Sequence, residues 1–360
     1  MGAATAETVV ANGVSPTDVA YQTRILQGVS RTFALTIPQL PPPLARVVGN
    51  AYLLCRIADT IEDEPGLSPA RKRRFSNQFV RVVSGGEAAE EFAGELSPLL
   101  SAYTLEAERD LVRNTPRVIR LTHSFNETQR RALSRCVRIM SGGMADFQEN
   151  KTLEGLEDLS ALDRYCYYVA GVVGEMLTEL FCDYSEEMRP HRDVLLKLAV
   201  SFGQGLQMTN ILKDLWDDRQ RGACWLPRDV FRGVGFDLKE LSPERYDPAF
   251  GKGLRALIGI ARMHLFNALT YTLMFPRHEA GIRRFCLWAV GMAVLTLRKI
   301  HRRLDFTSGR QVKISRRSVR ATVAVTSLTV RNDATLKLLF DVLTRGLPRP
   351  ADCRQIVLVS

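Results

Sequence analysis

Tyr52-Leu53-Leu54-Cys55-Arg56-Ile57-Ala58-Asp59-Thr60-Ile61-Glu62-Asp63 is the stretch that decides the fold of this chain. In a helix, residues three and four apart share a face, so the polar side chains form one stripe. That stripe consists of Tyr52, Arg56, Asp59, Glu62 and Asp63. The other faces are almost wholly apolar, which predicts a helix buried on most sides. Because a buried carboxylate without a partner is costly, we expect a cation opposite these acids.

A second stretch, from Gln207 to Gln220, has the same character. Helical spacing aligns Asn210, Asp214 and Asp218, with Asp217 beside them, on another apolar helix. Taken alone, either acidic stripe would also fit a solvated helix surface. Together, two such stripes favour a shared charged ligand, and divalent cations that bridge to phosphate oxygens fit best. Magnesium prefers one or two carboxylates plus substrate phosphates, which suits aspartates in two distant segments.

These residues resemble a known family. Asp59–Asp63 and Asp214–Asp218 are similar to the two aspartate-rich motifs of the squalene and phytoene synthases, the head-to-head prenyl transferases. Ser30–Phe33, Tyr165–Gly174 and Gln207–Asp214 match further motifs of that family, in the same order. The resemblance runs from about Ser30 to about Arg317 and implies an isoprenoid-synthase-type helical bundle around a central cavity.

The resemblance also implies roles for individual residues. The metal ligands would be Asp59, Glu62, Asp63, Asp214 and Asp218. The diphosphate would be bound by Ser30, Arg31, Arg56, Gln207 and Asn210. Tyr165 would act as a proton shuttle or cation stabiliser in the second step. Without the resemblance, Tyr165 would be interpreted as a core aromatic residue and Arg31 as a solvated arginine.

The implied reaction joins two farnesyl diphosphates into presqualene diphosphate, which NADPH then reduces to squalene. Val312-Lys313-Ile314 and the Phe285-Cys286 helix resemble squalene synthases, and so favour the reductive product. The cofactor contacts would be Thr32, Asn210, Lys313, Arg316 and Arg317. Ser315 departs from the pattern, because a basic residue usually follows Val-Lys-Ile. Family members that make dehydrosqualene, hydroxysqualene or phytoene without reduction are the alternative.

Other classes of function fit less well. Gly251–Ala256 matches the dinucleotide pattern G-x-G-x-x-A, but no β-rich strand precedes it, so we reject a Rossmann site. A non-catalytic scaffold that assembles at a membrane would have no reason to retain both acidic motifs. A head-to-tail prenyltransferase or terpene cyclase also uses paired acidic motifs, but the matches at Tyr165 and Ser30-Arg31 argue against it.

Composition restricts the partners and the compartment. The 360 residues carry a formal net charge of +10, which predicts anionic partners such as diphosphates or an acidic membrane surface. Basic residues are scattered and accompany no nucleic-acid-binding module, so we expect no nucleic acid partner. Seven cysteines without a C-x-x-C pair predict a reducing, cytoplasmic compartment, and the five histidines show no zinc spacing.

The chain is expected to form one all-α domain over residues 17–345, with a disordered N-terminus at 1–16 and a C-terminal tail at 346–360. Residues 87–110 are expected to form one surface helix, and the Val-rich Ala321–Val330 a helix, since a single strand cannot form a sheet. Phe285–Leu297 is an apolar run of about thirteen residues, shorter than the roughly twenty that span a bilayer. We expect no signal peptide, transmembrane segment or C-terminal anchor, and peripheral membrane contact at most. The oligomeric state stays open.

Overall fold

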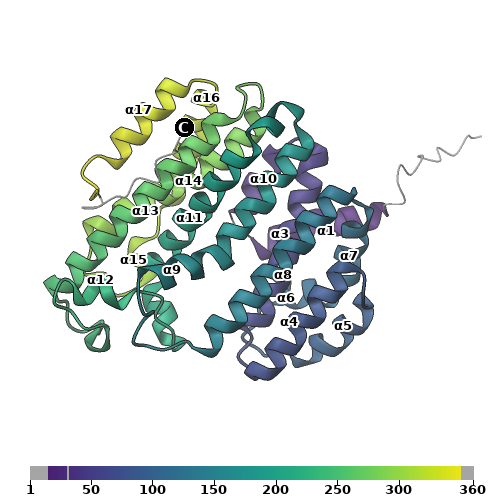
Figure 1. Ribbon diagram of the computed structural model, residues 1–360, viewed down its shortest axis with the longest axis horizontal. Helices are drawn as coiled ribbons and strands as arrows, with labels where there is room; N and C mark the ends of the chain where they lie inside the picture. Colours follow the sequence, from purple (N-terminus) through teal and green to yellow (C-terminus); the bar gives the residue numbers. More distant parts are fainter. Residues whose placement is uncertain (1–14, 31, 350–360) are drawn as a thin grey trace, which may run out of the picture. The chain divides into compact units, whose positions relative to one another are not determined.

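The computed structural model describes residues 15–30 and 32–349 (Figure 1). Throughout these ranges the regular elements are helices, and β pairing is limited to two isolated bridges. This confirms the all-α prediction. The chain divides into two compact units, Met1–Ile37 with Pro42–Gly142 and Pro38–Pro41 with Gly143–Ser360. The single domain around a central cavity stays a prediction, and the expectations for residues 1–14 and 350–360 lie outside the described residues.

The first unit is built around one long helix, α3 (Pro42–Asp63), which packs against α1, α4, α6 and α7. Its Leu53, Leu54, Ile57 and Ile61 are fully buried, as the periodicity predicts. The other helices of this unit are α1 (Pro16–Val29), α2 (Phe33–Thr36), α4 (Pro69–Ser84), α5 (Ala89–Leu96), α6 (Glu106–Arg113), α7 (Thr115–Ser124) and α8 (Glu127–Glu149) as far as Gly142. A 3₁₀ turn, Ile37–Gln39, follows α2.

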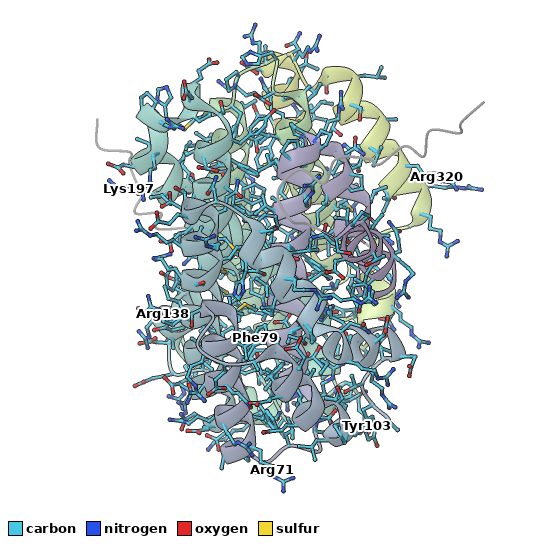
Figure 2. The ribbon with its side chains drawn as sticks, turned by 90° about the vertical axis from the view of Figure 1, so that its right-hand side faces the viewer. Arg71, Phe79, Tyr103, Arg138, Lys197 and Arg320 are labelled. Carbon is cyan, nitrogen blue, oxygen red and sulfur yellow. The ribbon has the colours of Figure 1, made fainter. Side chains whose placement is uncertain are left out.

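The prediction of one surface helix over residues 87–110 is wrong. The segment forms two helices, α5 and α6, separated by the 3₁₀ turn Ser97–Leu99 and a loop. Pro98 has no amide hydrogen to continue a helical ladder, and Phe92 and Leu96 are fully buried rather than on the surface. On α4, Arg71 points away from the ribbon into solvent and Phe79 points inward (Figure 2).

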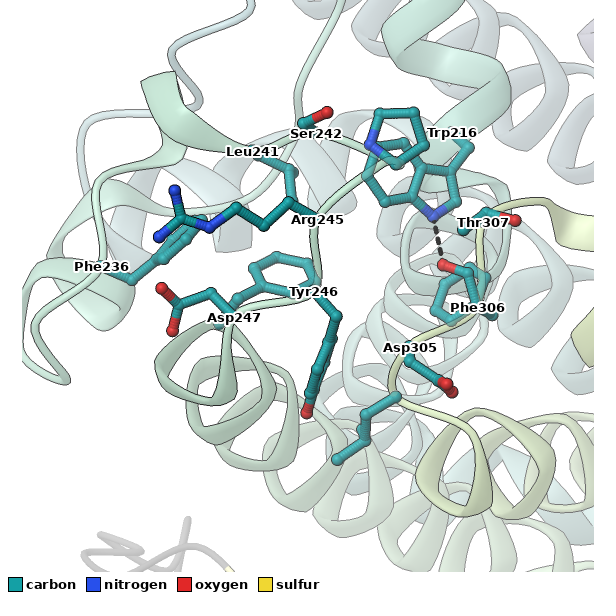
Figure 3. Close-up of a pocket in the computed structure, with 13 residues that line it drawn as sticks. Trp216, Phe236, Leu241, Ser242, Arg245, Tyr246, Asp247, Asp305, Phe306 and Thr307 are labelled. Atoms are coloured by element: carbon teal, nitrogen blue, oxygen red, sulfur yellow. Dashed lines mark hydrogen bonds between the residues drawn. The ribbon is translucent and has the colours of Figure 1, made fainter.

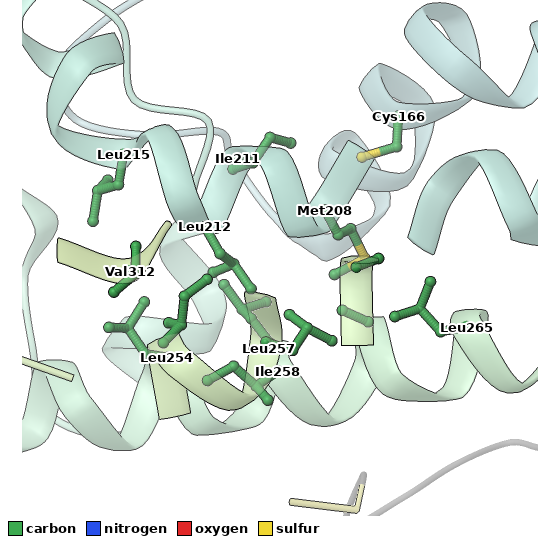
Figure 4. Close-up of a cluster of buried hydrophobic side chains, with 14 of the residues drawn as sticks. Cys166, Met208, Ile211, Leu212, Leu215, Leu254, Leu257, Ile258, Leu265 and Val312 are labelled. Atoms are coloured by element: carbon green, nitrogen blue, oxygen red, sulfur yellow. The ribbon is translucent and has the colours of Figure 1, made fainter. Parts of the chain in front are cut away.

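The second unit is built around α11 (Arg192–Gln220), which packs against α10, α13 and α14. Leu212 on α11 faces Leu257 and Ile258 on α13 in a continuous apolar core (Figure 4). The remaining helices are α9 (Leu159–Cys166), a π-helical turn (Tyr167–Gly171), α10 (Val172–Tyr184), 3₁₀ turns at Glu186–His191 and Leu238–Glu240, α12 (Arg228–Arg232), α13 (Pro248–Met274), α14 (Ala280–Arg302), α15 (Gly309–Val312), α16 (Arg316–Thr329) and α17 (Asp333–Thr344). The helix predicted for the Val-rich segment is therefore confirmed as part of α16.

Glycines allow two helices of this unit to approach closely. A Cβ on Gly174 of α10 would lie 2.3 Å from the carbonyl oxygen of Ala199 on α11. A Cβ on Gly203 of α11 would lie 2.3 Å from the carbonyl oxygen of Ala170. These glycines therefore let α11 pack closely against α10 and the turn that precedes it.

Among the described residues, one helix is long and apolar enough to cross a membrane, namely α14. However, 67% of its most apolar window is buried inside the structure, and core helices meet the same criterion. Phe285 and Trp288 of this helix are buried, as expected for a core helix. α14 therefore gives only weak evidence for a membrane span.

Candidate functional site

The first aspartate motif occupies the C-terminal end of α3. The apolar faces of the helix fix it in the core of its unit, so the polar stripe is its accessible side. The side chains of Arg56 and Asp59 are 28% and 31% exposed, Glu62 is half-buried and Asp63 is exposed. The motif thus presents carboxylates from a rigid helix end.

The acids of this motif crowd one another. Burial raises the pKa of Asp59 to about 7; Arg56 lowers that pKa, while the negative charges of Asp63 and Glu108 raise it further. Nη1 of Arg56 lies 3.8 Å from Oδ2 of Asp59 and 3.7 Å from Oε1 of Glu108. The expected cation is therefore Arg56 of the same helix, and it is shared between acids. An additional cation would be stabilised here.

Sequence reasoning missed Glu108, which lies on α6 and faces Arg56. The only local signal was its position as the third residue of a helix, where its side chain accepts a hydrogen bond from the amide of Leu105 at 3.3 Å. That position predicts a helix cap but gives no indication of a contact with α3.

The Ser30–Phe33 motif lies next to the polar stripe of α3 within the first unit. The Tyr52 hydroxyl donates a hydrogen bond to the carbonyl oxygen of Val29 at 3.0 Å, and Nη2 of Arg56 donates to the same oxygen at 3.4 Å. Oγ of Ser30 accepts a hydrogen bond from the amide of Phe33 at 2.9 Å. Thr32 is exposed, and Arg31 lies outside the described residues. The structure therefore brings Ser30 and Arg56 into one neighbourhood.

The second aspartate motif lies near the C-terminal end of α11. Nζ of Lys213 is 3.1 Å from Oδ1 of Asn210 and 3.1 Å from Oδ2 of Asp214. Asn210 and Asp217 are exposed, and Gln207, Asp214 and Asp218 are half-buried. Among the described residues no three His, Cys, Asp or Glu side chains group closely enough to hold a metal ion by themselves. A metal at either motif would need ligands from a substrate, as magnesium commonly has.

Gly309, the first residue of α15, lies against this motif. A Cβ at Gly309 would be 3.0 Å from the carbonyl oxygen of Lys213, 3.4 Å from Oδ1 of Asp214 and 3.6 Å from Oδ2 of Asp217. Sequence reasoning missed this residue. Its signal was a lone glycine three residues before Val312-Lys313-Ile314.

The basic segment begins directly after this contact. Lys313 follows α15, and Arg316 and Arg317 form the first turn of α16; all three side chains are exposed. Ser315 is the N-cap of α16, since its Oγ accepts a hydrogen bond from the amide of Ser318 at 3.1 Å. A helix cap thus gives a local structural reason for a serine where the family pattern has a basic residue.

Tyr165 lies in an aromatic cluster of the second unit. Its ring is stacked on Trp225, with centroids 4.2 Å apart and planes 9° apart, and Phe147 meets it edge-on at 5.3 Å. Both Tyr165 and Trp225 are 6% exposed. Sequence reasoning missed Trp225, whose loop was interpreted only as the end of the preceding helix.

A pocket of the second unit adjoins Trp216, which lies within the second motif (Figure 3). The indole Nε1 of Trp216 donates a hydrogen bond to the carbonyl oxygen of Phe306 at 2.6 Å. Phe236 and Phe250 line the pocket together with the charged Arg245, Asp247 and Asp305. This mixed lining does not suit a prenyl chain, so the lipophilic chamber stays a prediction.

Comparison with known proteins identifies relatives over most of the chain. A model of the squalene/phytoene synthase family matches residues 26–318. The squalene synthase of Eremothecium gossypii is 29% identical over 76% of this chain and 60% of that protein. The squalene synthase of Gibberella zeae is 30% identical over 81% of this chain and 61% of that protein. The chain thus spans about three fifths of the length of these curated relatives.

The fold also has solved counterparts. A structure of TcSQS in complex with the ligand BPH1237 aligns with a TM-score of 0.73, covering 93% of this chain and 94% of that chain. The sequence identity is 22%, so this likeness concerns the fold. It agrees with the all-α architecture described above.

Proposed function

The chain belongs to the squalene/phytoene synthase family, and we propose that it condenses two farnesyl diphosphates head to head, through presqualene diphosphate, to squalene. One observation carries the proposal: each aspartate motif lies near the C-terminal end of a long helix that is otherwise mostly buried, and its carboxylates are at least partly accessible there. The matched range, residues 26–318, includes both motifs and Tyr165.

We propose that Asp59, Glu62, Asp63, Asp214 and Asp218 hold Mg²⁺. Carboxylates are suitable ligands for this hard cation. The pKa of Asp59 is raised by burial and, to a smaller extent, by the negative charges of Asp63 and Glu108, and a cation beside these acids would offset that repulsion. Bound magnesium would withdraw charge from the leaving diphosphate and so ease ionisation of the allylic C–O bond.

The chain's own polar residues would bind the diphosphate. Arg56 already faces two acids beside the first motif, so it would pair with a phosphate oxygen. Ser30 lies beside it, and we place Arg31 in the same role. Asn210 and Gln207 supply amide groups on the second motif's helix.

Tyr165 would hold or transfer a proton, or stabilise the carbocation of the second step. Its neighbours support the second role, since aromatic faces attract positive charge and Trp225 with Phe147 keeps the region apolar. Exclusion of water protects a carbocation from premature quenching.

We propose that NADPH is the reductant and supplies the hydride that quenches the final cation. Lys313, Arg316 and Arg317 would contact its phosphates, with Thr32 and Asn210 as polar contacts. The position of α15 against Asp214 supports this, because it anchors the basic segment at the second motif. The alternative within the family is a non-reductive product: dehydrosqualene, hydroxysqualene or phytoene.

We place the protein in the cytoplasm, in peripheral contact with a membrane that receives the hydrocarbon product. Cys55, Cys136, Cys166, Cys182, Cys224 and Cys286 are buried and unpaired, which suits a reducing compartment.

A product assay tests the function. Farnesyl diphosphate with Mg²⁺ and NADPH should yield squalene, and omission of NADPH should leave presqualene diphosphate or a non-reduced hydrocarbon. One identical product with and without NADPH would assign the protein to the non-reductive branch. No product under any condition would favour the scaffold.

A pair of variants tests the metal role. Asp214→Asn should remove most turnover while the protein stays folded, whereas Asp229→Asn, an exposed aspartate on α12, should not. Unchanged turnover of Asp214→Asn in Mg²⁺ would refute the assignment.

A further inference from the structure

Helix α16 has an unusual surface for a globular protein. None of its fourteen residues is buried. One face carries Ala321, Ala324, Val325 and Leu328, all exposed, and Leu328 is 87% exposed. No Asp or Glu occurs in this helix. An amphipathic helix that leaves its apolar face in solvent indicates an unfilled interface.

The neighbouring helices also expose apolar side chains. On α17, Leu338 and Val342 lie one turn apart and are 62% and 47% exposed. On α13, Phe266 is 51% exposed beside Phe340 of α17, with ring centroids 5.9 Å apart. α17 packs against both α13 and α16. We name Phe266, Val325, Leu328, Leu338 and Val342 the C-terminal apolar surface.

Positive charge is concentrated in the same part of the chain. Residues 309–349 contain nine Lys and Arg but only two Asp, a net charge of +7 out of the chain's +10. All nine basic side chains are exposed: Arg310, Lys313, Arg316, Arg317, Arg320, Arg331, Lys337, Arg345 and Arg349. Figure 2 shows Arg320 pointing away from the ribbon.

These cations are not neutralised by the protein. Within the described part of the chain, none of the nine forms an ion pair with a carboxylate, whereas Asp333 is already paired with Arg277 and Arg283. A surface that combines exposed aliphatic side chains with uncompensated arginines is complementary to an anionic, amphipathic partner.

We propose that the C-terminal apolar surface, with the basic residues around it that have no role in the proposed reaction, Arg320, Arg331, Lys337 and Arg345, docks the protein on an anionic lipid bilayer. Leu328, Val325 and Leu338 would enter the headgroup–acyl boundary, and the arginines would extend to lipid phosphates. Nucleic acid would pair with the arginines but would leave the exposed leucines without a partner. Helix α14 cannot supply the membrane contact, because most of its apolar window is buried inside the structure. The proposal deepens the membrane contact proposed above by naming the surface and the lipid charge.

Vesicle co-sedimentation of the full chain tests this without substrate, so its failure would leave the reaction untouched. The protein should bind vesicles of phosphatidylglycerol and phosphatidylcholine at least tenfold more tightly than vesicles of phosphatidylcholine alone, and salt should weaken binding. Leu328→Ser should weaken binding about tenfold. Arg320→Ser and Arg331→Ser should weaken it about fivefold each.

Matched controls are Leu105→Ser and Arg71→Ser, which remove an exposed leucine and an exposed arginine elsewhere. They should bind like the unaltered protein. If Leu328→Ser also lowers the melting temperature, the arginine variants still test whether this surface binds the vesicles.

Equal binding to neutral and anionic vesicles would overturn the proposal. So would a Leu328→Ser variant that turns a dimer into a monomer without changing vesicle binding, since a second copy would then be the occupant.

Discussion

The indole of Trp225 lies parallel to the phenol ring of Tyr165, 4.2 Å away and 9° from coplanar. Phe147 closes a second side at 5.3 Å. One face of the Tyr165 ring is therefore unavailable to a substrate, and the ring can turn little without breaking the stack. Trp225 is thus expected to position Tyr165 rather than to react.

Replacement of Trp225 should affect the step assigned to Tyr165. Trp225→Leu removes a stacking contact worth about 1 kcal/mol, so conversion of presqualene diphosphate should fall about fivefold and this intermediate should accumulate. Trp225→Phe should largely restore the product ratio. Phe231→Leu, at another buried aromatic ring, controls for lost packing. A product ratio in Trp225→Leu equal to that of the control would reject a positioning role.

Gly309 should set the position of the second aspartate motif. In Gly309→Ala the new methyl group lies 3.0 Å from the carbonyl oxygen of Lys213, so the backbone or Asp214 must shift by a few tenths of an ångström. Because small displacements at a reacting centre are costly, turnover should fall about tenfold and the Mg²⁺ concentration for half-maximal activity should rise. Gly94→Ala meets no atom within 4 Å and is the control. A normal Mg²⁺ titration would show that Gly309 has no such influence.

Gly142 and Gly143 provide a matched pair within α8. A Cβ on Gly143 would lie 2.1 Å from the ring of Tyr168, whereas one on Gly142 meets nothing within 4 Å. Gly143→Ala should destabilise the protein by about 1–3 kcal/mol through overpacking, and Gly142→Ala should stabilise it by up to about 1 kcal/mol. Urea unfolding measures both. Equal effects of the two substitutions would contradict the assigned packing.

Glu64, directly after the first motif, should make stability depend on pH. It is buried and accepts hydrogen bonds from the amide of Gly66 at 2.7 Å, the amide of Ser101 at 2.9 Å and the hydroxyl of Thr104 at 2.6 Å. Burial alone would raise its pKa, but these donors outweigh burial and hold the pKa below the ordinary value. The stabilisation is therefore present above about pH 4.3, the unfolded value, and is lost as pH falls through the folded pKa.

Glu64→Gln should accordingly lower the free energy of unfolding by about 2 kcal/mol at pH 7 and by much less at pH 3. Glu157→Gln, at an exposed glutamate, should change little at either pH. Urea titrations at the two pH values provide the measurement. The same loss at both would mean that the carboxylate charge contributes nothing.

Periodicity located the helices because it reflects local geometry. The two predicted acidic helices, Tyr52–Asp63 and Gln207–Gln220, lie within α3 and α11, and each ends at the last residue of its helix. The prediction of one helix over residues 87–110 was wrong because it followed the acidic, alanine-rich composition, which favours a helix, and overlooked Pro98, which ends the first of the two helices.

Contacts between distant segments could not be predicted in this way. Glu108 reaches Arg56 from 52 positions away, Trp225 reaches Tyr165 from 60, and Gly309 reaches Asp214 from 95. No local pattern encodes such pairs. The resemblance identified the aspartates and Tyr165, but their roles as metal ligands and as a proton or cation group stay predictions.

The π-helical turn Tyr167–Gly171 joins α9 to α10 in one continuous rod. Relative to an α-helix it accommodates one additional residue, and each residue accounts for about 100° of rotation. Loss of a single codon from this segment would therefore restore a regular pitch and rotate Tyr165 away from Trp225, although no side chain of the cluster had been altered. A relative that lacks the π-helical turn would have to be aligned with a one-residue gap within Tyr167–Gly171, so that its aromatic cluster is compared with the correct residues.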